Sequence, residues 1–146
     1  MTTVPILEKG GVSPDGNWVT AFSLVTTPNA LGGEILAIPL HGGAPKKLCT
    51  GSGCGAVWSH DGRFLYVDMT ANASGPFAGK SVAIPIPVGK SLPDLPAAGL
   101  DANTGEIRLV GARVIEHGPI SPGSDPSIYV FAKRDLQRNL FRIPLH

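Results

Sequence analysis

Gly-Val-Ser-Pro-Asp-Gly, residues 11–16, is the stretch that decides the fold, because related sequences return twice along the chain. Residues 57–62 read Val-Trp-Ser-His-Asp-Gly, and residues 119–124 read Pro-Ile-Ser-Pro-Gly-Ser. Each copy precedes a short apolar run, and each run precedes a second one with an Ile-Pro pair. A period of roughly 45 residues built from short strands is typical of a β-propeller blade. The sequence therefore predicts an all-β chain, a partial propeller of about three blades.

The residue types of this stretch explain why it closes two strands. Proline presets φ at the second position of a type I turn, serine at the first position accepts a backbone hydrogen bond, and glycine tolerates positive φ. The runs that follow are rich in β-branched and aromatic residues, as strands require. We therefore assign a structural turn role to Ser13, Pro14, Asp15, Gly16, Ser59, Asp61, Gly62, Ser121 and Pro122.

The spacing of the copies sets the expected boundaries. Ser13 and Ser59 are 46 residues apart, and the first two Ile-Pro pairs keep that spacing. We expect four-stranded antiparallel blades at residues 11–49, 55–90 and 111–146, with 139–145 as the third strand of the last. Residues 4–8 would be the outer strand of a preceding or closing blade. A single turn of this kind would also suit an ordinary antiparallel meander, whereas three copies favour the propeller. The propeller predicts that four large apolar residues are buried between sheets: Trp18, Phe22, Trp58 and Leu65.

An insertion near residues 88–110 interrupts the repeat. Prolines, glycines and the lack of alternation between residues 89 and 99 describe an irregular segment. Residues 101–108 could form one or two helical turns with Asp101 as the cap. The insertion lengthens the repeat to 62 residues, counted from Ser59 to Ser121.

Composition limits the classes of partner. At 146 residues the chain is long enough for one domain with a real core. Twelve basic and eleven acidic side chains nearly balance, so we expect no nucleic-acid partner. No apolar run approaches the roughly 18 residues of a membrane span, so direct membrane insertion is not expected. The first residues lack the features of a signal peptide, which leaves the compartment open.

No motif for catalysis, a metal or a cofactor stands out. A Gly-x-Ser-x-Gly nucleophile motif is missing, and the glycine-rich residues 51–55 lack the lysine and helix of a phosphate-binding loop. Asp15 and Asp61 lie in a repeated turn, which favours a structural role over a catalytic one. The histidines are scattered without metal-ligand spacing: His41, His60, His117 and His146.

The two cysteines, Cys49 and Cys54, are predicted to lie near each other. Their spacing permits a disulfide in an oxidising compartment. Free thiols are the alternative, which the missing export signal favours slightly.

The motifs resemble the TolB-like propeller repeat, a WD-like blade found in many bacterial proteins. Residues 57–63, Val-Trp-Ser-His-Asp-Gly-Arg, are similar to the start of that blade, and residues 40–50, Leu-His-Gly-Gly-Ala-Pro-Lys-Lys-Leu-Cys-Thr, to its end. Residues 111–145 are similar to a closing blade that in related chains follows a serine/threonine kinase domain or stands in an exported protein. His60 replaces the usual proline. The resemblance implies a propeller and a periplasmic or extracytoplasmic location.

Propellers of this kind present loops on a rigid face, which favours a non-catalytic binding or scaffold module for a protein or a cell-envelope ligand. The alternative is a propeller that gates or senses for a peptidase or kinase domain absent from this chain. Closed rings typically need four to eight blades. The chain would therefore be the closing part of a longer propeller or would self-associate through residues 18–24 and 128–131.

Overall fold

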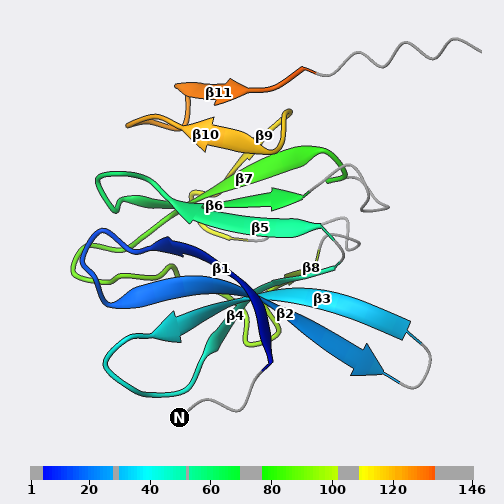
Figure 1. Ribbon diagram of the computed structural model, residues 1–146. Coiled ribbons are helices and arrows are strands. Elements are labelled where there is room, and N and C mark those ends of the chain that lie inside the picture. The colour runs from blue at the N-terminus through cyan, green and yellow to red at the C-terminus, as the bar shows by residue number, and fades with distance from the viewer. Residues whose placement is uncertain (1–4, 28–29, 52, 70–76, 102–108, 134–146) are drawn as a thin grey trace, which may run out of the picture.

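The computed structural model describes residues 5–27, 30–51, 53–69, 77–101 and 109–133, which form three β-sheets stacked in chain order (Figure 1). No helix occurs in these ranges, so none of their segments has the length and apolarity of a membrane-crossing helix. The all-β prediction is therefore confirmed for the described residues.

The first sheet has five strands where four were expected. Its order is β1 (Ile6–Val12), β2 (Trp18–Thr27), β3 (Ala30–Pro39), β4 (Lys46–Thr50) and β8 (Leu100–Asp101). Strand β1 pairs antiparallel with β2, so residues 6–8 belong to this sheet and not to a separate outer strand. The short strand β8 lies parallel to β4, with Cys49 opposite Leu100. The fifth strand thus comes from the insertion, whose irregular sequence gives no strand signal.

The second sheet has the order β5 (Cys54–Trp58), β6 (Phe64–Met69), β7 (Lys80–Pro85) and β9 (Arg113–Ile115), all antiparallel. Its fourth strand lies beyond the insertion, with Ile115 opposite Ser81. We expected residues 113–115 to open the last blade, and they instead close the second sheet. A run of three strand residues carries too little periodicity to show which sheet it joins.

The third sheet is a hairpin of β10 (Ile120–Pro122) and β11 (Tyr129–Phe131). The strand expected at 139–145 lies outside the described residues, as do residues 102–108 of the possible helical segment. Asp101, the expected cap, lies in β8.

The main core fills the space between the first and second sheets. Alternate side chains of β6, Leu65, Val67 and Met69, are fully buried against the first sheet. Trp58 is 6% exposed, which with Leu65 confirms two of the four predicted core positions. Trp18 and Phe22 pack against the same core but are only partly buried.

The other face of β6 packs on the third sheet. Tyr66 is fully buried there, in a smaller cluster with Ile115 and Ile120. Asp68 is also buried on this face, and its Oδ1 accepts hydrogen bonds from Ser81 Oγ at 2.5 Å and from Ile120 N at 3.4 Å. The second sheet is therefore covered on both faces, which explains why its strands are apolar on both sides.

A disulfide joins the first two sheets. Cys49 at the end of β4 is bonded to Cys54 at the start of β5, with Cα atoms 6.4 Å apart. The two residues lie together as expected, and the structure has the bridge where the sequence slightly favoured free thiols. Both cysteines are buried in the main core, so the link is sheltered from solvent.

Candidate binding face

The β1–β2 turn is held by a small network around one carboxylate. Ser13 Oγ donates to Asp15 Oδ1 at 2.5 Å and accepts from Trp18 N at 2.9 Å. Asn17 N donates to the same Asp15 oxygen at 3.1 Å, and Gly16 takes a φ of 73°. Serine and aspartate together satisfy backbone donors that the tight turn leaves unpaired, which explains the sequence preference.

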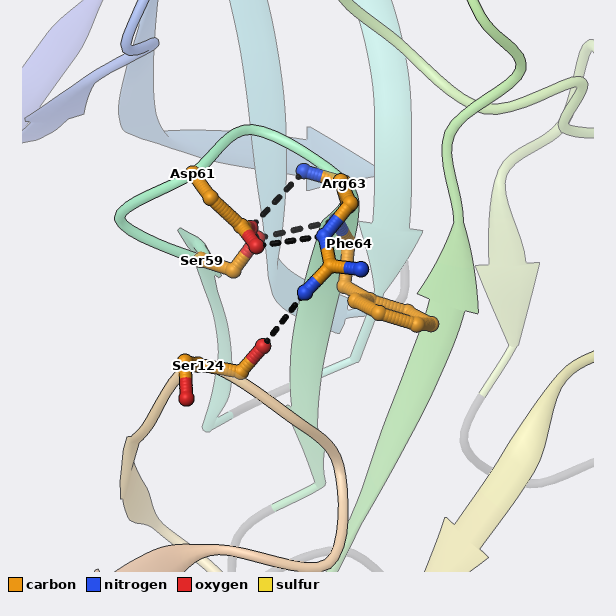
Figure 2. Close-up of polar contacts among 5 residues, drawn as sticks. All are labelled: Ser59, Asp61, Arg63, Phe64 and Ser124. Carbon is orange, nitrogen blue, oxygen red and sulfur yellow. Dashed lines mark hydrogen bonds and ion pairs between the residues drawn. The ribbon is translucent and has the colours of Figure 1, made fainter.

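The β5–β6 turn repeats this network at every position (Figure 2). Ser59 Oγ donates to Asp61 Oδ1 at 2.7 Å and accepts from Phe64 N at 2.9 Å. Arg63 N donates to Asp61 Oδ1 at 3.1 Å, and Gly62 takes a φ of 72°. Ser59, Asp61 and Gly62, which the sequence analysis assigned to a turn, lie in this β5–β6 turn.

The third turn lies two residues later than the sequence suggested. Ser121 and Pro122, expected to be turn residues, lie in β10. Gly123 N donates to Ile128 O at 2.8 Å, just as Ser13 N donates to Trp18 O. Asp125 takes the place of the turn aspartate, because its Oδ1 accepts from Ser127 N at 2.9 Å.

The third turn is hard to recognise in the sequence because it lacks the serine of the other two turns. Gly123 stands where the other two turns have serine. A Cβ atom at Gly123 would lie 2.7 Å from Ile128 O, closer than real Cβ contacts allow. The third turn therefore cannot hold the serine without moving its backbone, and only the aspartate remains of the motif.

All three turns lie at the same end of the stacked sheets, on the left in Figure 1. Gly62 lies beside Pro14 of the preceding turn. Arg63 forms an ion pair with Asp61, with Nε 2.5 Å from Oδ2, and its Nη2 donates to Ser124 O at 3.1 Å (Figure 2). The turns thus form one continuous surface, which we call the turn face.

The turn face keeps its carboxylates charged at neutral pH. Hydrogen bonds from Ser13 and then Ser91 hold the pKa of Asp15 far below its usual range. Hydrogen bonds from Ser59 and Arg63 lower the pKa of Asp61 to about 2. Hydrogen bonds from Ser127 likewise lower the pKa of Asp125.

The insertion supplies a second wall of the turn face. Residues 86–101, which we call the strap, cross from the end of β7 in the second sheet to the edge of the first sheet, where β8 pairs with β4. Ser91 O accepts from Trp58 Nε1 at 3.0 Å, and Ser91 Oγ donates to Asp15 Oδ2. Lys90 pairs with Asp94 at 2.7 Å. The strap therefore fastens the first turn to the second sheet.

A cleft of about 440 Å³ lies between the strap and the first two turns. Asp15, Asp61, Arg63 and Lys90 supply its charged side chains. Prolines, glycines and the edge of Trp58 line much of the remainder, and Val88 at the tip of the strap is fully exposed. Sequence reasoning missed Lys90, Ser91 and Asp125 as members of this face, because their place depends on where the insertion folds back.

The described residues show no arrangement suited to metal chemistry. Within them, no three histidine, cysteine or carboxylate side chains converge on one point. His60 is exposed beside the second turn, His117 stacks on Phe131 with ring centroids 4.0 Å apart, and His146 lies outside the described residues. No protein-family model, curated protein or solved structure matches the chain.

Proposed function

We propose that the protein is a non-catalytic binding module, a partial β-propeller of the TolB-like kind whose three sheets are consecutive blades. The stacked order of the sheets supports this proposal, because propeller blades pack face to face in chain order. The recurrence of one aspartate-centred turn at the same end of each sheet supports it further. That recurrence is the single observation that carries the proposal.

The turn face is the proposed binding surface. Loops at one end of stacked sheets form a rigid platform, and binding sites favour such loops. The cleft beside the strap adds a concavity with both apolar and charged walls, which is typical of recognition sites. Its walls come from two sheets and the strap, so the site depends on the folded arrangement.

The charges favour a protein segment over a phosphate-bearing polymer. Asp15 and Asp61 stay ionised at neutral pH and repel phosphates. The two cationic side chains of the cleft already have carboxylate partners, Arg63 with Asp61 and Lys90 with Asp94. An uncharged extended peptide is therefore the occupant we propose, contributed by a protein of the cell envelope.

A peptide-display library selected against the purified protein tests the site. Peptides that bind the wild type should lose affinity about tenfold or more for Val88→Glu, which adds charge at the cleft rim without removing any packing. Val110→Glu is the matched control, because Val110 is 98% exposed and lies outside the cleft. Selected peptides should bind this variant as tightly as the wild type.

Three outcomes would overturn the proposal. Equal binding to the Val88→Glu and Val110→Glu variants would place the peptide away from the cleft. If no peptide is enriched on the purified protein relative to an uncoated surface, the protein does not bind peptides as proposed. Cosedimentation with purified peptidoglycan, if it is lost in Val88→Glu alone, would replace the peptide by an envelope polymer.

A further inference from the structure

A second hollow lies beside the cleft, where the β1–β2 turn meets the β5–β6 turn. Its volume is about 300 Å³, and we call it the side pocket. Gly11, Val12 and Pro14 form one wall, and residues 57–60 form the other. Among the described residues that line it there is no carboxylate, lysine or arginine, so the side pocket is less polar than the cleft.

One proline stands between the side pocket and the cleft. Pro14 lines both hollows, and its ring lies beside Gly62, because a Cβ atom at Gly62 would be 3.6 Å from Pro14 Cγ. Residues 86–91 of the strap line only the cleft, whereas Gly11 and His60 line only the side pocket. A chain that lies in the cleft can therefore continue over Pro14 into the side pocket.

The side pocket has open space where glycine lines it. Gly11 lies in the irregular part of the β1–β2 pairing, between Lys9 and Val12. A Cβ atom at Gly11 would meet no atom outside its chain neighbours within 4 Å, whereas one at Gly10 would collide with Thr20 Oγ1. The strand is therefore tightly packed at Gly10 and open at Gly11.

His60 supplies a hydrogen-bonding group at the edge of the side pocket. Its side chain is exposed, and within the described part of the chain it has no hydrogen-bond or ion-pair partner. The charged groups of the cleft differ, because Asp61 and Arg63 already pair with each other. A neutral imidazole has one nitrogen that donates and one that accepts, so His60 can bind an N–H or a C=O group of a peptide.

We propose that the side pocket takes a second anchor of the peptide that occupies the cleft. This anchor is an uncharged side chain that enters beside Gly11 and Pro14, and His60 forms a hydrogen bond with the main chain next to it. A charged side chain would lose hydration in a hollow that offers it no counter-ion. The inference rests on the proposed function, because it assigns a second contact point to the same peptide.

Two variants alter the side pocket without changing a residue of the cleft. Gly11→Leu places a branched side chain at the open position and should weaken binding of the selected peptides about tenfold. His60→Ala removes the hydrogen bond and should weaken binding roughly fivefold. His41→Ala is the matched control, because His41 is exposed and lines neither hollow. Fluorescence anisotropy of a labelled peptide measures each dissociation constant.

An alanine scan of the bound peptide separates the two anchors. Replacing the peptide residue that occupies the cleft should cost less affinity in Val88→Glu than in the wild type, because that contact is already damaged. Replacing the second anchor should likewise cost less in Gly11→Leu. Two different peptide positions should therefore respond. A single position that couples to both protein variants would show one contact point and would overturn the inference.

The remaining outcomes separate this inference from the proposed function. If Gly11→Leu and His60→Ala bind as tightly as the wild type while Val88→Glu binds weakly, the side pocket is not used and the proposed function stands. If Val88→Glu also binds as tightly as the wild type, both fail. If Gly11→Leu unfolds at a lower urea concentration than the wild type, His60→Ala decides, because that exposed position can change without loss of packing.

Discussion

The contact between the first and second sheets is built very differently from that between the second and third. The first contact holds the main apolar core, the Cys49–Cys54 disulfide and the strap, which bonds to both sheets through Ser91. The second contact holds a smaller apolar cluster, the buried Asp68 and the Arg63–Ser124 hydrogen bond.

The difference indicates two levels of stability in one stack. Buried apolar area is the main stabilising term, so the first two sheets should unfold together as a unit. The β10–β11 hairpin has fewer buried side chains and should open locally at lower cost.

Leu65→Ala should have the largest effect. Leu65 is fully buried in the first contact, and truncation leaves a cavity there, so we expect a loss of about 3 kcal/mol in the free energy of unfolding. Urea unfolding followed by tryptophan fluorescence measures it. Val110→Ala, at an exposed site, should change little. A loss for Leu65→Ala below about 1 kcal/mol would contradict the described core.

Removing the disulfide should come next. The double variant Cys49→Ala/Cys54→Ala frees the short loop between the first two sheets and should lower stability by about 2 kcal/mol. Unfolding midpoints with and without a reductant provide the measurement. The wild type should be sensitive to the reductant and the double variant insensitive. Equal wild-type midpoints in both conditions would show that the bridge contributes nothing.

Ser59→Ala should cost about 1 kcal/mol, because two hydrogen bonds of a buried hydroxyl are lost in the second turn. Ser121→Ala provides the contrast. Ser121 is the serine that the sequence aligns with Ser59, but it is exposed in β10, so its removal should change stability little. Thermal unfolding measures the stability of both variants. Equal losses of stability would support the alignment of Ser121 with Ser59 that the sequence suggests.

The sequence predicts strands β2 to β7 and the first two turns, because each of them carries a local signal. Serine, aspartate and glycine at fixed positions specify a turn, and a spacing of 46 residues sets the register from Ser13 to Ser59. The third turn escapes this reasoning, because Gly123 has no room for the serine that would mark it. Packing, and not turn preference, decides that position.

The candidate site is less predictable than the fold. Its turns come from local motifs, but its second wall is the strap, whose path follows from distant pairing between β8 and β4. Ser91 reaches Asp15 across 76 positions of the chain, and no local pattern encodes such a contact. The burial of Asp68 is equally hidden, because alternation in β6 shows only that its position shares a face with Tyr66.

The smallest expected effect concerns Asp68, the buried carboxyl of the second contact. Burial raises its pKa, although hydrogen bonds from Ser81 and Ile120 partly oppose this shift. The folded chain therefore keeps the proton over a range in which the unfolded chain, with a carboxyl pKa of about 3.9, has lost it. The folded state binds more protons there, so the Asp68 contribution to stability falls as pH rises above about 4.

Asp68→Asn should remove this decline, because an amide cannot ionise and still accepts the hydrogen bond from Ser81. Urea midpoints of the two proteins from about pH 3 to about pH 7 should diverge, with the variant gaining as pH rises. The Asp61 carboxyl contributes to stability with the opposite pH dependence, because its pKa is lowered in the folded chain. Its contribution is present above about pH 4 and is lost on acidification toward about pH 2, so Asp61→Asn should lose stability relative to the wild type as pH rises. Parallel curves for Asp68→Asn and the wild type would show that the second contact tolerates the charge, and that its weakness relative to the first comes from apolar area alone.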